Sequence, residues 1–585
     1  MGKVTAKSYL SPTMVLLAMD WDEGANTQDF LGFAIKRTPG FSPGPGQPNA
    51  ASNWLPNRIG FNGANPGGGD MPSNQNPLQH FHWFDARINT ADRGTVITYE
   101  IFPVTGTVGN LTLLQNKSAT VKCTIPQVVV NGIGTYFNRA VVSSQAFSKQ
   151  FGSITTHAQY VQALEWLSNG MDDALTAFIN GADGKGLAGV AYHLTDNQWT
   201  IPALQNFKSK ANFVYFLKEE PSGGDTTNLK TLITLKPKKN ITFFPRTKTN
   251  IMHDKFLVRV TSDAPESSEA VLMGTANFTT EGLTQQANVI HTFESPGLAK
   301  LYMERHLLLR TDPSVANTAK GAKWSNKIKM PDATVRVFFP PEHPAPSHNA
   351  PAGSRISIDT VVNAVKAAKS SVFFSLFSVT DADLLDACLS VAQQGKLMRG
   401  LVNEIREPKP DAPENASTVA ATWLFDRSQD DNMVVGHDNF EKGNVPNGFW
   451  FENNVLMDPS APPSTKISKS FVPNVYVHQK IVIIDGESKH PIVYVGSANL
   501  SGNSTWHNDE NLLEITDCPT LSSIYVAEFM RLYESYRARF AWNQSHPSGG
   551  SQSSGGFNLT KDSSWAAKDY RQGTMEFLAR TILSK

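Results

Sequence analysis

The chain has 585 residues, more than one hydrophobic core normally covers, which predicts about three to four domains. Apolar residues make up 40% and charged residues 18%, as in an ordinary globular protein. Basic and acidic residues number 52 each, so the formal net charge is zero and no overall basic field attracts nucleic acid. The balance argues against a general DNA-binding protein, although such a count would not reveal a local basic cleft.

The N-terminal segment predicts neither a signal peptide nor a membrane span. Its apolar stretch, Met14–Met19, is short and runs directly into Asp20, Asp22 and Glu23. We therefore expect a cytoplasmic protein, with export by a route that needs no cleaved signal left open. The three cysteines are far apart and show no C-x-x-C spacing, which favours buried thiols over a disulfide framework or a zinc–thiolate site.

Residues 1–127 are predicted to form a β-sandwich-like domain. Apolar and polar residues alternate around Val15–Trp21, Ile97–Ile101 and Ala119–Ile125, which is the period of half-buried strands. Residues 41–80 are rich in Gly, Pro and Asn and should form a long surface loop. His80 and His82 make a lone H-x-H with no third ligand recognisable nearby, so packing or surface histidines are favoured over a metal site.

The rest of the chain reads as two α/β halves, at residues 128–330 and 331–547, followed by a linker and a docking helix at 548–585. Each half repeats the order helix, strand, helix, strand, which predicts a sheet with helices on its faces. The expected elements are Tyr160–Ile179, Gly189–Leu194, Ile201–Phe207 and Asn212–Leu217 in the first half, and Thr360–Ala368, Ser371–Val379, Asp383–Val391 and Met398–Asn403 in the second.

The second half carries a polar insertion at residues 406–470 with one aromatic cluster, Phe449-Trp450-Phe451. The cluster is consistent with a buried strand, which is the favoured interpretation, or with a lip that faces the substrate. Ser548–Gly556 is expected to be a flexible linker, after which Trp565–Leu583 has helical periodicity.

A compound motif occurs once in each half. His253 and Lys255, and again His478 and Lys480, lie two residues apart in an apolar extended run, so each pair projects from the same face of a strand. A Gly-Ser/Thr-Ala-Asn turn follows each run and an asparagine recurs beyond it. The turns contain Thr275 and Asn277 in the first half and Ser497 and Asn499 in the second, and the recurring asparagines are Asn288 and Asn511.

These residues resemble the H-x-K-x-x-x-x-D signature of the phospholipase D superfamily, over roughly residues 130–545. The second copy is complete, with Asp485 and a downstream Glu510. In the first copy Val260 replaces the aspartate, and Gln286-Ala287 stands where the second copy has Asp509-Glu510. In this respect the chain resembles the tyrosyl-DNA phosphodiesterases. The departure therefore argues against assuming an ordinary lipid-cleaving phospholipase D.

The residue types suit a two-step phosphodiester cleavage. One imidazole can attack phosphorus while a second, protonated imidazole serves the leaving alcohol. Lysine and asparagine side chains can bind the phosphoryl oxygens, so neither a metal nor another cofactor is expected. The resemblance implies that the amino-terminal motif supplies the nucleophile, hence His253, with His478 as general acid and base. We expect Glu510 to orient His478, and Gln285 or Gln286 to orient His253.

Several residues have a simpler interpretation. Asp485 is better explained as a structural partner of its strand than as an acid, although it belongs to the motif. Thr275, Ser497, Asn288 and Asn511 are candidates for substrate binding, and the two hydroxyl residues also form turns. His193 is interpreted as a packing histidine and His507 as a minor candidate for the pocket wall.

The predicted architecture is a β-sandwich followed by two pseudo-symmetric halves with one active site between them, so the catalytic unit should be a monomer. The predicted function is a phosphodiesterase that acts on phospholipids by hydrolysis or transfer, with peripheral membrane contact. A nuclease of the same superfamily and a non-catalytic phosphate-binding protein remain alternatives.

Overall fold

The computed structural model describes residues 2–585 except 43–46, 65–68, 141–143, 219–226, 343–354, 410–413, 430–432, 439, 441–444, 447–448, 451, 453–455, 462–475 and 547–556. Much of the long Gly/Pro/Asn loop is described, and it contains only two-residue strands. Phe451 and the Ser548–Gly556 linker lie outside the described residues. Among the described helices, none is both long enough and apolar enough to cross a bilayer.

The N-terminal region is a sandwich of two antiparallel sheets, as predicted. One sheet has the order β1-β2-β9 and the other β11-β10-β3-β4, with β12 also paired to β10. The alternating inward residues of both sheets, such as Val15, Leu17, Phe33 and Tyr99, share one apolar core. The strands are β1 Thr5–Ser11, β2 Met14–Asp20, β3 Phe30–Thr38, β4 Asn53–Trp54, β9 His82–Asp85, β10 Val96–Thr107, β11 Asn110–Leu113 and β12 Ala119–Thr124.

The first α/β half is built on an eight-stranded mixed sheet of order β13-β14-β20-β19-β18-β15-β16-β17. Its strands are β13 Val129–Val130, β14 Ile133–Phe137, β15 Gly186–Ala191, β16 Lys210–Phe216, β17 Ile241–Arg246, β18 Lys255–Val260, β19 Ser268–Gly274 and β20 Val289–Phe293. Its main helices are α1 Gln145–Phe151, α2 His157–Ser168, α3 Met171–Asn180, α4 Thr200–Asn206, α5 Thr227–Leu235, α6 Thr280–Thr284 and α7 Pro296–Leu309.

The second half repeats this sheet strand for strand, in the order β21-β22-β28-β27-β26-β23-β24-β25. The strands are β21 Ile328–Met330, β22 Ala333–Phe338, β23 Ser371–Leu376, β24 Leu397–Val402, β25 Val434–Gly436, β26 Lys480–Ile484, β27 Ile492–Gly496 and β28 Leu512–Thr516. The main helices are α9 Ile356–Lys366, α10 Ala382–Gln393, α11 Ala416–Gln429, α12 Gly502–Trp506 and α13 Pro519–Ser545. The identical order confirms the predicted duplication and the α/β fold class.

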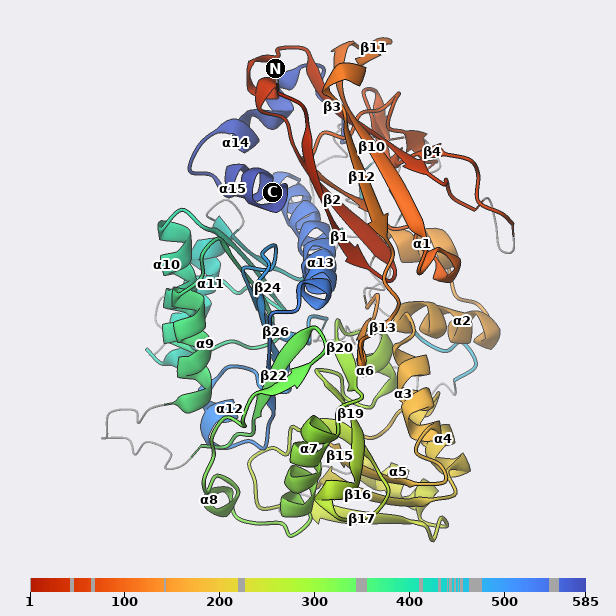
Figure 1. The fold of residues 1–585 in the computed structure, drawn as a ribbon, viewed down its shortest axis with the longest axis vertical. Coiled ribbons are helices and arrows are strands. Elements are labelled where there is room, and N and C mark those ends of the chain that lie inside the picture. The colour runs from red at the N-terminus through yellow and green to blue at the C-terminus, as the bar shows by residue number, and fades with distance from the viewer. Residues whose placement is uncertain are drawn as a thin grey trace.

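One predicted helix is two. The stretch Tyr160–Ile179 breaks between α2 and α3, because Asn169 ends α2 in the left-handed conformation (φ +57°) and Gly170 follows with φ +87°. An asparagine followed by glycine is well suited to such a helix end. The break directs α2 and α3 along different lines over the first half (Figure 1).

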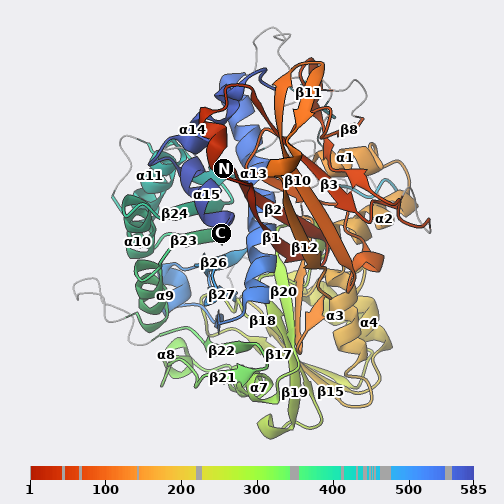
Figure 2. The same cartoon turned by 45° about the horizontal axis from the view of Figure 1, so that its top comes forward.

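The long helix α13 lies between the N-terminal sandwich and the second half, as both ribbon views show (Figures 1 and 2). Its residues Phe529, Tyr533 and Tyr536 are buried in a core shared by all three parts of the molecule. The C-terminal helices α14 Ala567–Tyr570 and α15 Met575–Leu583 pack back beside the sandwich. The three cysteines are free and buried, as expected.

Candidate active site at the interface of the two halves

The two H-x-K motifs meet across the pseudo-two-fold axis. His253 precedes β18 and His478 lies just before β26, so the paired central strands of each sheet carry them to the interface. Short parallel bridges cross it, between Met252 and Asp509 and between Ala287 and Val477. Two backbone bonds fix the histidines, since His253 N donates to Asp509 O (2.8 Å) and His478 N donates to Ala287 O (3.1 Å). The ring centroids lie 6.5 Å apart.

The imidazole of each H-x-K motif is oriented by the opposite half. His253 Nδ1 lies 2.8 Å from Glu510 Oε2 and 3.1 Å from the carbonyl oxygen of Ser497. His478 Nδ1 lies 2.9 Å from Asn288 Oδ1. The prediction that Glu510 orients His478 is therefore wrong, as is the glutamine assigned to His253. The physical reason is the crossed bridging, which brings the segment before Asn511 to His253 rather than to its own motif.

The neutral partner of His478 is held in one orientation. Asn288 Nδ2 donates to Gly282 O (2.8 Å), and Thr275 Oγ1 donates to Asn288 Oδ1 (2.8 Å). These contacts assign the amide oxygen to the side that faces His478, so Nδ1 carries the proton and Nε2 faces the reaction space. Thr275 and Asn288 are fully buried and position His478, a role that the sequence had not indicated. Their contact with substrate stays a prediction.

Ser497 and Asn511 play the corresponding part in the second half. The Ser497 hydroxyl hydrogen-bonds to Glu510, and Asn511 Nδ2 donates to Asp254 Oδ1 (2.8 Å). Ser504 Oγ also donates to Glu510 Oε1 (2.9 Å). Ser497 and Asn511 are fully buried. Their polar atoms hold Glu510 and Asp254, and their contact with substrate stays a prediction.

Each motif lysine lies against an aromatic ring that the sequence analysis missed. Lys255 Nζ is 5.1 Å from the ring of Tyr192, and Lys480 Nζ is 5.2 Å from the ring of Phe377. Both aromatics directly follow the equivalent strands β15 and β23, and each also touches its motif histidine. The repeated aromatic after an apolar run was a signal available in the sequence.

Burial dominates the electrostatics of the site. It lowers the pKa of both His253 and His478 well below the ordinary value, with the two lysines adding to the effect, so both imidazoles are neutral at pH 7. Burial lowers the pKa of Lys255 to about 7 and that of Lys480 well below its ordinary value. Burial also raises the pKa of Glu510 to about 6. A bound phosphodiester would supply the missing negative charge and favour protonated lysines.

The turn asparagines retain unused hydrogen-bonding capacity. Asn277 Oδ1 and Asn499 Oδ1 are buried without a hydrogen-bond partner among the described residues. Nearly all buried polar atoms in proteins are hydrogen-bonded, so such atoms are expected where a ligand completes the site. Asn277 and Asn499 thus fit the predicted role of phosphoryl contacts.

A buried ion-pair network lies behind His253. Arg305 contacts both Asp254 (3.2 Å) and Asp509 (3.5 Å), and Arg246 contacts Asp509 at 2.8 Å. Burial raises the pKa of Asp254 to about 6. Because Asp254 and Asp509 flank the bridge between the halves, the network fixes the His253 backbone. The second half has Gln479 in place of Asp254, bonded to Ser375, so the network is one-sided.

Asp485 lies at the other end of β26 from Lys480. Its carboxylate accepts hydrogen bonds from the backbone N–H groups of Lys369 and Ser370, at 2.8–2.9 Å, and its φ is +51°. Asp485 follows Lys480 by five residues, about 16 Å along an extended strand. These contacts agree with the favoured interpretation of Asp485 as a structural partner of its strand and not with a catalytic role for this member of the motif. Val260 is buried at the equivalent end of β18.

The two other histidines considered in the sequence, His193 and His507, differ in their distance from the site. His193 stacks on Tyr192, with ring centroids 3.9 Å apart, and its charge would lower the pKa of both catalytic histidines, so it lies close to the site. His507 is exposed, and its carbonyl oxygen accepts a backbone bond from Asn250.

A cavity of about 720 Å³ opens beside Phe377 in the second half. Its wall mixes polar and apolar side chains, among them Asn403, Glu404, Leu424 and Tyr476. The volume is within the usual range for small-molecule sites, about 300–1,000 Å³. Since Phe377 also contacts His478, the cavity adjoins the H-x-K site.

The aromatic cluster of the insertion is neither a strand nor a free lip. Phe449 and Trp450 lie outside any strand. The Trp450 ring stacks beneath the Arg58 guanidinium, 4.2 Å away, and Phe449 packs on Phe440. The favoured interpretation as a buried strand is wrong for these two residues. They join the insertion to the N-terminal domain instead.

Residues 361–533 match the family model described as "Cardiolipin synthase, PLD-like domain". This range contains the second H-x-K motif, Glu510 and most of the second sheet. The match identifies residues 361–533 as a phospholipase D-like domain. The first half repeats the strand order and the H-x-K motif of that domain.

Solved structures give remote likenesses. Phosphatidylserine synthase of Haemophilus influenzae Rd KW20 is 13% identical, with 64% of this chain and 85% of that chain covered and a TM-score of 0.40. Polyphosphate kinase of Porphyromonas gingivalis is 13% identical, with 59% and 46% covered and a TM-score of 0.34, so the chain spans less than half of that enzyme. Yeast tyrosyl-DNA phosphodiesterase is 10% identical, with 56% and 82% covered and a TM-score of 0.30. No curated protein matches the chain.

Proposed function

We propose that this enzyme cleaves phospholipid phosphodiesters without a metal at the reacting phosphate, through a phosphohistidine on His253, by hydrolysis or by transfer to another alcohol. The observation that carries the proposal is the pair of imidazoles whose rings lie 6.5 Å apart, each with Nδ1 engaged by the opposite half. With Nδ1 engaged, the Nε2 atoms of both rings are left for chemistry.

In the first step, His253 Nε2 attacks phosphorus and forms an N–P bond while the P–O bond to the leaving alcohol breaks. Nδ1–H of His253 donates to Glu510, whose negative charge stabilises the positive charge that develops on the phosphorylated ring. His478 enters this step protonated and gives its Nε2 proton to the leaving oxygen. Asn288 is an uncharged partner, so it stabilises protonated His478 less than a carboxylate would and leaves it the stronger acid.

In the second step, His478 Nε2 takes a proton from water or from an acceptor alcohol, whose oxygen attacks phosphorus. The N–P bond breaks and His253 returns to its neutral state. Lys255 and Lys480, with Asn277 and Asn499, bind the non-bridging oxygens in both steps. Substrate binding must therefore protonate His478 and the lysines, which the negative charge of the phosphodiester favours.

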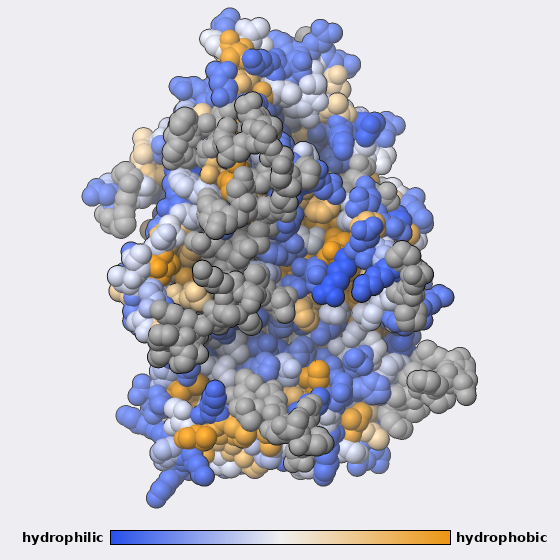
Figure 3. All heavy atoms as spheres, turned by 180° about the vertical axis from the view of Figure 1, so that it is seen from behind, coloured by the Kyte–Doolittle hydropathy of each residue, from blue (hydrophilic) through white to orange (hydrophobic). Residues whose placement is uncertain are grey.

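Three observations support a lipid substrate. The matched family model describes cardiolipin synthase. The formal net charge is zero, which gives no long-range attraction for polynucleotides. The 720 Å³ cavity beside Phe377 has the size of a small head group or alcohol rather than of a continuous groove. On the face opposite Figure 1, apolar residues appear in several groups among hydrophilic ones (Figure 3).

A nucleic-acid substrate is the second candidate. It is favoured by the first half, in which Gln286-Ala287 replaces an acidic pair and His478 has an amide partner, a departure that resembles the tyrosyl-DNA phosphodiesterases.

The deciding experiment offers the purified chain phospholipid vesicles, single-stranded DNA and RNA, each with excess EDTA, and measures release of the alcohol or of oligonucleotides. The His478→Asn variant is the matched control. Cleavage of vesicle lipid that the variant lacks supports the proposal. Cleavage of nucleic acid alone moves the assignment to a nuclease, and binding without cleavage of any substrate would make the chain a phosphate-binding protein.

A further inference from the structure

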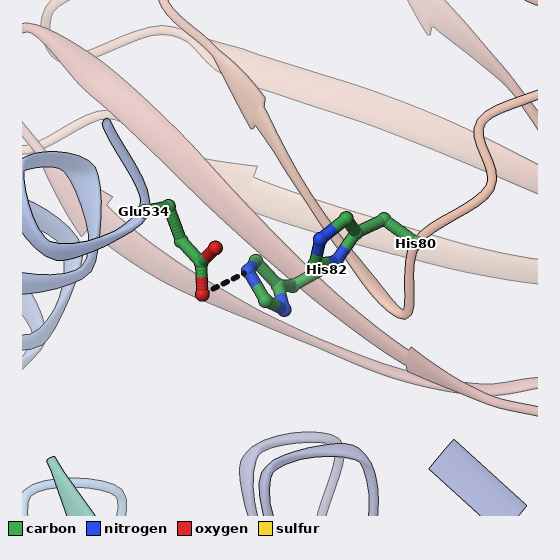
Figure 4. A group of neighbouring side chains, drawn as sticks. All are labelled: His80, His82 and Glu534. Carbon is green, nitrogen blue, oxygen red and sulfur yellow. Dashed lines mark ion pairs between the residues drawn. The ribbon is translucent and has the colours of Figure 1, made fainter. Parts of the chain in front are cut away.

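Three side chains with metal-binding chemistry meet where the N-terminal sandwich packs on α13. His80 and His82 come from the start of β9, and Glu534 comes from the middle of α13 (Figure 4). Within the described residues, this is the group of three histidine, cysteine or carboxylate side chains that could hold one ion. The sequence showed the H-x-H without a third ligand, because Glu534 lies at the far end of the chain.

The spacing suits a single ion. One ligand atom of each residue lies within 4.8 Å of the other two, and His82 Nε2 is 3.3 Å from Glu534 Oε1. Two ligands of a tetrahedral zinc ion with bonds of about 2.0–2.1 Å stand about 3.3 Å apart. The pair His82–Glu534 already has this separation, so only His80 has to move closer by a rotation of its side chain.

The His82 nitrogen has no hydrogen-bond partner. His82 is 8% exposed, and its Nε2 atom is buried 3.3 Å from Glu534 Oε1 without a hydrogen-bond partner among the described residues. Buried polar atoms rarely lack a partner, and a cation bound between these two atoms would give Nε2 one.

Arg537 is the cation that faces the cluster most closely. It contacts Glu534 through Oε2 at 2.6 Å, which leaves Oε1 toward His82. Its contact with His80 Nε2 is longer, 3.2 Å, and is the one that His80 gives up when that atom turns to an ion. Arg537 then remains as the outer partner of the carboxylate, a common arrangement around metal ligands.

We propose that His80, His82 and Glu534 bind a zinc ion that ties the N-terminal sandwich to helix α13. Two nitrogens and one carboxylate oxygen are a ligand set that zinc accepts, with water in the fourth position. The ion would join the sandwich to the helix, because two ligands come from the sandwich and one from α13. It takes no part in the reaction at His253 and His478.

The test uses the full chain stripped of metal with a chelator and then dialysed. Zinc binding is measured by calorimetric titration and by metal content, Co²⁺ substitution is followed by visible absorption, and melting is followed with and without zinc. The variants are His80→Asn and His82→Asn. His490→Asn is the matched control, since His490 is an exposed histidine that also pairs with a carboxylate, Asp517.

We expect the stripped wild type and His490→Asn to bind zinc with the same affinity within about twofold, at a stoichiometry of about one, and to melt at higher temperature with zinc. Each cluster variant should bind at least about 100-fold more weakly, show no tetrahedral Co²⁺ bands and gain no melting temperature. Melting of the stripped variants at the temperature of the stripped wild type shows that they fold. Stoichiometric zinc binding that survives His82→Asn, or no binding by the wild type, overturns the proposal.

Discussion

Replacing Glu510 by Gln removes the charge that faces His253 while keeping the shape of the side chain. The hydrogen bond of 2.8 Å between His253 Nδ1 and Glu510 is buried, and Glu510 is also held by Ser497 and Ser504. A hydrogen bond to a charged partner contributes about 1.5–3 kcal/mol. At 1.36 kcal/mol per factor of ten, its loss should lower kcat by about 10- to 150-fold if the bond strengthens in the transition state.

The same variant should change the pH profile. The pKa of Glu510 is raised to about 6, so in the wild type a proton enters the Glu510–His253 pair as the pH falls through about 6, and activity declines there. Glutamine cannot take that proton. The pKa of His253 is already low through burial and falls further without the carboxylate, so the acidic decline should move to lower pH.

The assay is steady-state hydrolysis of a soluble phosphodiester between pH 4.5 and 9, with Glu514→Gln as the control. Glu514 is also a buried glutamate, but it pairs with Arg336 and Tyr494 away from the site. A change in KM alone, or an acidic decline that stays at the wild-type pH, would refute the role given to Glu510.

Three further outcomes are expected. Asn288→Ala, which removes the partner of His478, should lower the first-turnover release of an alkyl alcohol at least about tenfold, yet change the first-turnover release of p-nitrophenol little, because that leaving group needs no proton. Equal losses in this first step would argue against His478 as the acid. Asp485→Asn should lower the free energy of unfolding by about 1–3 kcal/mol in urea melts, while kcat of the folded enzyme stays within about twofold. A large loss of kcat at unchanged stability would instead indicate a catalytic role for Asp485. Excess EDTA, applied well below the melting temperature, should leave activity intact even if it removes the proposed zinc ion. A loss of activity that one divalent cation restores would contradict metal-independent cleavage at phosphorus.

The strands that carry the motif residues could be predicted from the sequence, but the hydrogen-bond partners of those residues could not. The i, i+2 spacing placed His253 and Lys255 on one face of a strand, and the repeat of the motif implied a second equivalent strand, because both facts are local. The pairing of Glu510 with His253 could not be deduced in the same way. It depends on the bridge between Met252 and Asp509, which joins segments more than 250 residues apart and exists only in the assembled fold.

The other residues that were not predicted also divide into those placed by long-range packing and those with a local signal in the sequence. Arg305 and Arg246 approach Asp254 and Asp509 from α7 and β17, and no spacing along the chain relates them. Glu534 reaches His82 only because α13 packs on the sandwich. Tyr192 and Phe377 are different: both follow equivalent strands, so alignment of the two halves residue by residue would have found them.

The most direct test of the two-step mechanism is to trap the phosphorylated enzyme. His478→Asn removes the general base that the second step needs, so brief incubation with a p-nitrophenyl phosphodiester, quenching in base and peptide mass spectrometry should find the phosphoryl group on His253, as an adduct that acid releases. Adducts on another residue, or turnover of the wild type with no phosphorylated peptide at any time in rapid-quench samples, would contradict a phosphohistidine at His253.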